Sequence, residues 1–164
     1  MPITIRTATD SDWPAVWPFM RDIIRAGETY TYDRDLDEGQ ARSTWFLPPP
    51  AHTVVAVDAA GAVVGTAKTN PNHMGGASHI ASASFMVDAA RAGRGVGRVL
   101  GEYVIEWARA EGYRAIQFNA VVETNTRAVR LWRSLGFEIM TTLPEGFRHP
   151  EHGYVGLHIM YRRL

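Results

Sequence analysis

The stretch FMVDAARAGRGVGRVLGEYVIEWARAEG, residues 85–112, decides the fold of this chain. It predicts a short apolar strand, then a turn containing Gly93, Gly95 and Gly97, then a helix whose apolar side chains recur on one face. The first turn of a helix leaves backbone N–H groups without partners, and the helix dipole makes that end positive. Glycines let a ligand approach those N–H groups, and the two neighbouring arginines add forked donors for phosphate oxygens. The sequence therefore predicts a phosphate-binding turn where this helix begins.

Three other interpretations of the glycine-rich turn compete with this one. The glycines could serve only a tight connection between strand and helix, and this alternative stays open. A P-loop has the pattern G-x-x-x-x-G-K-S/T, which is absent here. A dinucleotide-binding fingerprint has the spacing G-x-G-x-x-G and an acidic residue after the next strand, whereas this turn reads G-x-G-x-G and Glu123 comes too late.

The composition narrows the classes of protein to consider. The 164 residues suffice for one domain with a sizeable core. The 17 Lys and Arg balance the 17 Asp and Glu, so no overall charge favours nucleic acid or a membrane surface as a partner. The chain has no apolar run long enough for a membrane span, no signal-peptide pattern and no cysteine. We expect a cytoplasmic protein with a single domain over residues 1–164.

Strand-like and helix-like segments alternate along the chain. The expected helices begin near Trp13, with a kink or restart at Pro18, and cover residues 36–46, the segment after the glycine turn, and NTRAVRLWRSLGF. The expected strands cover residues 3–7, a hairpin within 52–70, and residues 78–88, 115–122, 136–142 and 154–164. A loop, LPEGFRHPEHG, is expected at 143–153. The prediction is a mixed α/β sheet of six or seven strands with about four helices.

The strand FMV, the turn AGRGVG and the later segment NTRAVRLWRSLGFE resemble the two central motifs of the GNAT superfamily of acyl-CoA-dependent N-acetyltransferases. The resemblance implies the GNAT fold and acetyl-CoA as the acyl donor. It also implies that the turn holds the pyrophosphate of coenzyme A and that the preceding strand lies along the pantetheine arm. The cofactor-binding residues implied in this way are Phe85, Met86, Val87, Arg94, Gly95, Val96, Gly97, Arg98 and Asn125.

Two positions depart from the family pattern. Ala92 stands where the turn usually carries Gln or Arg, with Arg91 one place earlier. Trp132 stands where many relatives have a tyrosine that protonates the departing thiolate, and an indole N–H has no such acid chemistry. Either another acid serves or none is needed, because a thiol with a pKa of about 8.5 is a tolerable leaving group. The harder requirement is a neutral amine, which a carboxylate or a chain of waters could provide by taking its proton.

The strand AIQFNAVV is expected to place Phe118, Ala120 and Val122 on one face and Asn119 and Val121 on the other. Asparagine is unusual in a strand, so Asn119 is either a solvent-exposed amide or a pocket residue. The segments QFNAVVETN and RLW..LGF resemble, more narrowly, the L-azetidine-2-carboxylate and proline-analogue acetyltransferases. That resemblance implies that Asn119 positions the substrate and that Ser82 replaces a second asparagine.

Further candidates lie in two loops and one strand. The loop GETYTYD offers Glu28, Tyr30 and Tyr32 for proton removal or substrate contact, although an ordinary aromatic loop would look the same. Phe147 and His149 are expected to line the acceptor entrance, and His79 is a candidate proton shuttle. His149 and His152 lack further ligands, so no metal is expected. The predicted catalytic residues are Asn119, Glu28 and Ser82, and the predicted substrate contacts are Tyr30, Tyr32, Asn119 and Phe147.

Three functions fit the sequence. The first is acetyl transfer from acetyl-CoA to a small-molecule amine of amino-acid-like structure. The second is acetylation of a protein or peptide amine on the same fold. The third is a non-catalytic acyl-CoA-binding regulator, which the presence of Trp132 at the usual acid position suggests. Homodimers are frequent among similar enzymes, so a homodimer is a further expectation from the resemblance.

Overall fold

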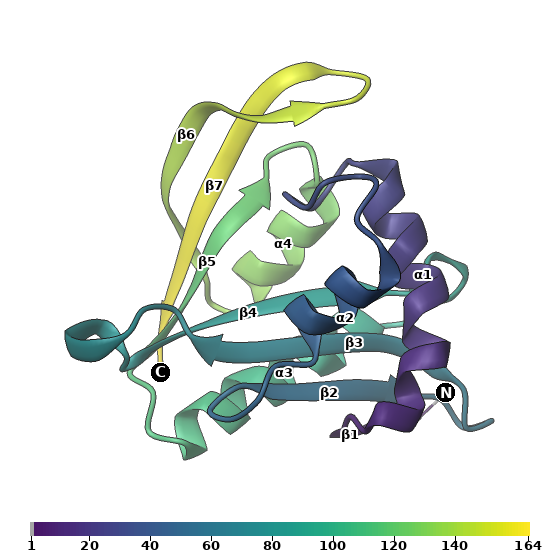
Figure 1. The fold of residues 1–164 in the computed structure, drawn as a ribbon. Helices are drawn as coiled ribbons and strands as arrows, with labels where there is room; N and C mark the ends of the chain where they lie inside the picture. Colours follow the sequence, from purple (N-terminus) through teal and green to yellow (C-terminus); the bar gives the residue numbers. More distant parts are fainter. Residues whose placement is uncertain (1) are drawn as a thin grey trace.

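The computed structural model describes residues 2–164, which form one seven-stranded sheet with helices on both faces (Figure 1). The strands lie in the order β1-β2-β3-β4-β5-β7-β6. Among residues 2–164, β4 and β5 pair in parallel and the other neighbouring strands pair antiparallel. The strands are β1 (Thr4–Thr7), β2 (His52–Val57), β3 (Val63–Pro71), β4 (Ile80–Val87), β5 (Ala115–Val122), β6 (Glu138–His149) and β7 (Gly153–Arg163).

The helices are α1 (Trp13–Ala26), α2 (Glu38–Trp45), α3 (Val96–Ala110) and α4 (Thr126–Ser134). α1 and α2 cover one face of the sheet through a core that contains Met20 and Trp45. α3 and α4 cover the other face through a core that contains Leu100 and Trp132. The predicted mixed α/β fold is thus confirmed. None of the helices in residues 2–164 combines the length and the apolar character needed to cross a membrane.

α1 continues through Pro18, where the sequence predicted a kink or a restart. A proline inside a helix removes one backbone hydrogen bond. Val16, Met20 and Ile24 are buried against the sheet, and full burial of such a side chain contributes roughly 1.5–3 kcal/mol, which offsets the lost bond. Gly27 ends the helix with a φ of 67° and turns the chain into the loop at 28–37.

The parallel strands β4 and β5 pair only where they begin. Ile80 lies opposite Ala115 and Ala81 lies opposite Ile116, and the two strands then diverge, as Figure 1 shows. Each strand keeps its other neighbour, because β4 pairs with β3 and β5 pairs with β7. The sheet is therefore split at its centre.

The pairing of β4 with β3 determines which backbone groups face this split. Asn72 donates its N–H to the carbonyl of Ile80, and Asp88 donates to the carbonyl of Val64. These bonds assign the even-numbered residues of β4 to the ladder with β3. The backbone N–H and C=O groups of the odd-numbered residues Ala83, Phe85 and Val87 consequently face the split.

β5 carries a bulge beside Asn119. Phe118 pairs with Met160, whereas Val121 pairs with His158, so β5 has one residue more than β7 between these pairs. The bulge shifts the alternation of side chains along β5. Phe118 and Val121 belong to the core under α3 and α4, while Ala120 and Val122 pack with the β6–β7 hairpin. The prediction that Ala120 and Val122 share a face with Phe118 is wrong for this reason.

β6 and β7 form a long hairpin that extends beyond the rest of the sheet (Figure 1). The sequence predicted a loop at 143–153, but β6 continues to His149 and the register shifts between Leu143 and Phe147. This irregularity accommodates the segment Pro144–Gly146, in which Glu145 has a φ of 54°. Glycine and proline in this segment therefore mark a bulge within a strand and not a connecting loop.

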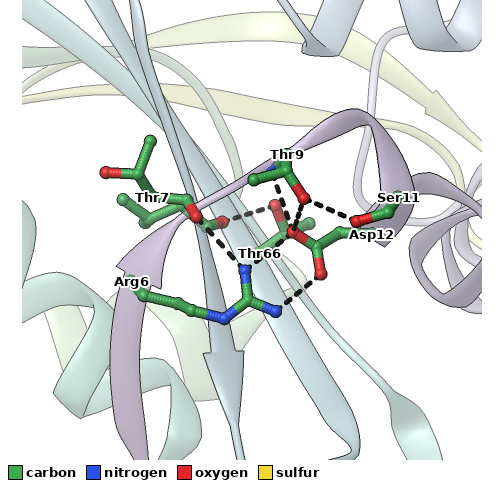
Figure 2. A network of polar contacts seen from close by, with 7 residues as sticks. Arg6, Thr7, Thr9, Ser11, Asp12 and Thr66 are labelled. Atoms are coloured by element: carbon green, nitrogen blue, oxygen red, sulfur yellow. Dashed lines mark hydrogen bonds and ion pairs between the residues drawn. The ribbon is translucent and has the colours of Figure 1, made fainter.

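A polar network joins β1 to the beginning of α1 (Figure 2). The guanidinium of Arg6 donates to both carboxylate oxygens of Asp12 at 2.7 and 2.8 Å. The backbone N–H of Thr9 donates to Asp12 Oδ2 at 2.8 Å, which completes a capping box for the 3₁₀ turn at Asp10–Asp12. Asp12 is only 6% exposed, and its hydrogen bond with Arg6 lowers the pKa of the carboxyl to about 2. This network fixes the edge of the sheet at the far side from the split.

Candidate active site

The glycine turn forms a hollow at the N-terminus of α3. Gly95 precedes the helix with a φ of 81°, a conformation that glycine adopts without strain. A Cβ added at Gly95 would meet no atom within 4 Å, so the turn is open toward the solvent. The hollow has a volume of about 370 Å³ and is lined by residues of the turn, of β4 and of α4. Free N–H groups at such a helix end are suited to an anion.

Two arginines line this hollow, and the sequence predicted only one of them. Arg98 lies there as expected, and its Nη2 donates to Ser134 Oγ at 2.7 Å. Arg127, in the first turn of α4, lines the same hollow and was missed. Its Nη2 lies 3.4 Å from the position that a Cβ on Gly93 would take. The signal for Arg127 was its place two residues after Asn125, at the start of a helix beside the turn.

Arg94 lines a different hollow, on the opposite side of the turn, together with Asp58 and Arg91. Arg94 therefore does not line the hollow at the N-terminus of α3, where the resemblance placed it. Both glycines that flank Arg94 have positive φ angles. Arg91 donates to Asp58 Oδ2 at 2.8 Å, and Asp58 also accepts from two N–H groups of its own turn. This buried carboxylate thus anchors the segment that precedes the glycine turn.

Close packing of α3 against α4 places the second motif beside the turn. A Cβ on Gly97 would lie 3.2 Å from Leu131, and a Cβ on Gly101 would lie 2.7 Å from Leu135. These glycines let the two helices approach closely. The side chain of Asn125 accepts a hydrogen bond from the N–H of Ala128 and so caps α4.

A second cavity, of about 400 Å³, lies in the split between β4 and β5. It shares Phe85, Val87, Asn125 and Trp132 with the hollow at the glycine turn. The two cavities therefore adjoin along β4, and we call them together the channel. We call the part at the glycine turn the donor end and the part in the split the acceptor end.

Tyr30 reaches from the loop after α1 into the acceptor end. Its hydroxyl donates to the backbone carbonyl of Phe85 and accepts from the N–H of Phe85 at 3.0 Å. The ring stacks on Tyr32, with 5.7 Å between the ring centroids. Burial raises the pKa of the hydroxyl of each tyrosine above its ordinary value, so both stay neutral.

Aromatic rings form the opposite wall of the acceptor end. The ring of Trp132 lies 4.6 Å from the ring of Phe85 and 4.9 Å from the ring of Phe118, measured between centroids. Trp132 is only 7% exposed. This residue therefore provides an apolar wall at the position where the family resemblance implies an acid.

Amide side chains lie at the mouth of the acceptor end. Asn119 lines the cavity, donates to Asn72 Oδ1 at 2.6 Å and accepts from Gln117 at 3.0 Å. Ser82 lines the same cavity from β4. The structure thus brings together two predicted acceptor-side residues, Asn119 and Ser82. Asn72 does not line the cavity but holds the Asn119 amide in place, a role that no sequence pattern indicated.

Two predicted residues, Glu28 and Phe147, lie outside the acceptor end, and a third, Met86, does not turn its backbone toward it. Glu28 is exposed and does not line the cavity, whereas its neighbours Thr29 to Tyr32 do. Phe147 is buried in a cluster with Val122, Val155 and Leu157, because the expected loop is a strand. Met86 lines the cavity, but its backbone belongs to the ladder with β3.

The histidines are also placed away from the cavity. His79 lies in the exposed turn before β4 and not within the strand. His149 is buried, and its Nδ1 accepts from the N–H groups of Glu151 and His152 in the hairpin turn. Within residues 2–164, no three His, Asp or Glu side chains are grouped so that they could hold a metal ion.

The acceptor end is electrically neutral. Within the described part of the chain, its lining contains hydroxyl, amide, aromatic and aliphatic side chains but no Asp, Glu, His, Lys or Arg. Only Tyr30 and Tyr32 can titrate there, and burial raises the pKa of each. The cavity can therefore orient a substrate by hydrogen bonds but holds no side chain that would act as a base near neutral pH.

Comparisons with known proteins agree with this geometry. Residues 17–137 match the family described as Acetyltransferase (GNAT) family. N-acetyltransferase aca1 of Schizosaccharomyces pombe is 27% identical over 156 residues, which cover 86% of this chain and 75% of aca1. The structure of a GCN5-related N-acetyltransferase from Kribbella flavida is 60% identical with a TM-score of 0.96, covering 99% of this chain and 98% of that chain.

A more distant structure shows the same fold. The phosphinothricin acetyltransferase of Sinorhizobium meliloti, solved in complex with AcCoA, is 23% identical with a TM-score of 0.88 and covers 100% of this chain and 89% of that chain. The family match extends over most of the chain and includes both the glycine turn and the start of α4. The chain therefore belongs to the GNAT family of acetyl-CoA-dependent N-acetyltransferases.

Proposed function

We propose that the protein transfers the acetyl group of acetyl-CoA to the amine of a small, amino-acid-like molecule. The observation that carries this proposal is that the two cavities adjoin and share lining residues. A hollow at a helix N-terminus, suited to phosphates, adjoins a neutral cavity of about 400 Å³ in the split of the sheet. Acetyl-CoA, a substrate of this reaction, has phosphates at one end and a thioester at the other, which matches that polarity.

The residues of the donor end fit the chemistry of coenzyme A. The N–H groups of Val96 and Gly97 and the guanidinium groups of Arg98 and Arg127 would hold the pyrophosphate. The backbone groups of Val87 and Phe85 that face the split would hold amides of the pantetheine arm. Asn125 lies where the two cavities meet and would contact the arm there.

At the acceptor end, the chain's own residues would orient the amine. Reaction needs a nitrogen lone pair, which bonds to the carbonyl carbon while the carbon–sulfur bond breaks and a thiolate leaves. The nitrogen then gives up a proton to water or to that thiolate. Asn119 and Ser82 can hydrogen-bond the amine, but neither removes its proton. The amine therefore reacts as the neutral species, deprotonated in solution or by water in the cavity.

The size and lining of the acceptor end support a small acceptor. The cavity of about 400 Å³ must also hold the acetyl end of the donor, which leaves little room for a polypeptide. The narrower resemblance of QFNAVVETN supports amino acids of the proline-analogue type. No cationic side chain among residues 2–164 lines this cavity, so amide and hydroxyl donors such as those of Asn119 would hold an acceptor carboxylate.

Steady-state turnover, measured by release of the free thiol, tests the proposal. The amine panel contains L-azetidine-2-carboxylate, other proline analogues, the common amino acids, polyamines and short peptides. We expect turnover of at least one amino-acid-like compound and none of the peptides. Turnover of peptides alone would assign the protein to the second function, and acetyl-CoA binding without turnover of any amine would assign it to the third.

A further inference from the structure

Phe85 occupies a special place in the channel, because its backbone groups lie between the two ends. Its N–H and C=O face the split, where β5 has diverged and offers no partner. Val87, the next residue with this orientation, lies nearer the glycine turn and lines both cavities. An extended arm that runs from the turn into the acceptor end must therefore pass Val87 and then Phe85.

Tyr30 already occupies the backbone groups of Phe85. The phenol hydroxyl donates to the carbonyl and accepts from the N–H at 3.0 Å, so one oxygen atom satisfies both groups. A phenol does this only while it is neutral, and burial raises the pKa of Tyr30. The ring is held by stacking on Tyr32 and by an edge contact with Trp45 at 6.3 Å between centroids.

Acetyl-CoA carries groups of the same hydrogen-bonding kind. An amide of its arm has one donor and one acceptor, and the thioester carbonyl is an acceptor. We propose that the Tyr30 hydroxyl is a placeholder, which takes the backbone position of the incoming arm in the free protein and must leave Phe85 when acetyl-CoA binds. The inference rests on the use of acetyl-CoA and not on the identity of the acceptor amine.

Displacement of Tyr30 changes the acceptor end, because residues on both sides of it line that cavity. Thr29, Thr31 and Tyr32 belong to the same loop and the same wall. Arg34 of this loop donates to the carbonyl of Arg25 at 2.7 Å, which ties the loop to the end of α1. Donor binding is thereby coupled to the shape of the acceptor end.

The variant Tyr30→Phe tests the placeholder, because it removes the hydroxyl and keeps the ring. Acetyl-CoA then no longer has to break two hydrogen bonds in the free protein, so calorimetry should show binding about five- to tenfold tighter than in the wild type. The control probe is 3′-phosphoadenosine 5′-diphosphate, which lacks the arm and should bind both proteins equally. Tyr103→Phe is the control variant, since its hydroxyl lies 3.2 Å from His52 and not in the channel.

Unchanged or weaker binding of acetyl-CoA by the Tyr30→Phe protein would overturn the proposal. It would show that the hydroxyl does not compete with acetyl-CoA and keeps its contacts when acetyl-CoA is bound. A fall in kcat without a change in affinity would do the same and would make Tyr30 a donor to the reacting carbonyl. If the variant does not fold, hydrogen exchange of the wild-type protein decides. Residues 27–37 should exchange faster with acetyl-CoA than without it, and slower or equal exchange contradicts the placeholder.

Discussion

The donor end of the channel uses backbone groups and cations, whereas the acceptor end uses neutral side chains. At the donor end, Gly95 leaves the N-terminus of α3 open, and Arg98 and Arg127 lie beside it. At the acceptor end, Asn119, Ser82 and aromatic rings line a cavity without a charged residue. The two ends are joined along β4, where Phe85 and Val87 face both.

This difference separates two kinds of recognition. Backbone N–H groups and guanidinium groups recognise phosphate with little regard to what else the ligand carries. Neutral hydrogen-bonding side chains select a ligand whose shape fits the cavity. They disfavour a ligand that lacks the matching donors or acceptors, because the polar groups of the protein are then left without hydrogen bonds. Substitutions at the donor end should therefore change the affinity for acetyl-CoA. Substitutions at the acceptor end should change kcat/KM for the amine.

The largest expected effect follows from Gly95→Asp. The new carboxylate would lie beside the proposed pyrophosphate, and two negative charges close to each other repel strongly. The affinity for acetyl-CoA should therefore fall by on the order of 100-fold or more. Isothermal titration calorimetry measures this affinity. The control is Gly112→Asp at the other end of α3, which has a similar φ of 87° and equally open space. Equal affinities of the two variants would place the phosphates elsewhere.

The next effect concerns the dependence of the rate on pH. Because the acceptor end has no base and burial raises the pKa of Tyr30 and Tyr32, the rate should follow the neutral fraction of the amine. The value of kcat/KM for the amine should rise about tenfold per pH unit up to the pKa of that amine. Two amines of different pKa give the test, since their profiles should shift with the amines. A shared inflection near pH 6 or 7 would reveal an enzymic base and contradict the neutral cavity.

Arg127→Ala should weaken acetyl-CoA binding about tenfold, since a charge-assisted hydrogen bond contributes roughly 1.5–3 kcal/mol. Arg94→Ala is the comparison, because Arg94 lines the hollow on the other side of the turn. Its effect on the KM for acetyl-CoA should be less than about twofold. The reverse order of effects would restore the sequence prediction for Arg94 and remove Arg127 from the donor end.

Asn119→Ala should act on the amine alone. Loss of one neutral hydrogen bond costs about 1 kcal/mol, so kcat/KM for the amine should fall about fivefold while the KM for acetyl-CoA stays the same. Gln117→Ala provides the control, since Gln117 donates to Asn119 but does not line the cavity. If Asn119→Ala changes both kcat/KM for the amine and the KM for acetyl-CoA, the donor end and the acceptor end do not act independently.

The same contrast explains what the sequence could predict. The donor end lies in one contiguous segment, so spacing alone indicated the strand, the open turn and the helix, and the resemblance identified the family. The acceptor end combines residues from the loop after α1, from β4 and from β5, whose contacts depend on tertiary structure. The bulge beside Asn119 contains neither glycine nor proline, so no residue type marked it in the sequence. The strand at Phe147 was predicted as a loop because glycine and proline mark loops and bulges alike.

The predicted role of Glu28, the homodimer, the cytoplasmic location and the type of acceptor stay predictions, because they too depend on more than a local sequence pattern. Glu28 was selected for its chemistry and its loop, but the loop turns its tyrosines inward and leaves the carboxylate exposed. The homodimer and the cytoplasmic location are properties that the contacts within one chain do not test. The azetidine-carboxylate type of acceptor depends on Asn119 and on Ser82, and it requires the turnover measurements.

The smallest effect on the channel is expected from Asp12→Asn, which breaks the network of Figure 2 far from both ends. Arg6 holds the pKa of Asp12 at about 2, below the value of about 3.9 in an unfolded chain, so the ion pair stabilises the fold above pH 4 and this contribution is lost as the pH falls toward 2. We expect a loss of about 1–2 kcal/mol in the free energy of unfolding at pH 7.

Urea unfolding at several pH values measures this loss, which should shrink as the pH falls from about 4 to about 2. Asp10→Asn is the matched control, because Asp10 pairs with Arg42 but its side chain is 89% exposed, and an exposed pair contributes only a few tenths of a kcal/mol. Neither variant should change the affinity for acetyl-CoA. A weaker affinity of the Asp12→Asn protein for acetyl-CoA would show that the β1 edge of the sheet and the channel are coupled through β2 and β3. The difference between the donor end and the acceptor end would then depend on the whole sheet and not only on the residues that line each end.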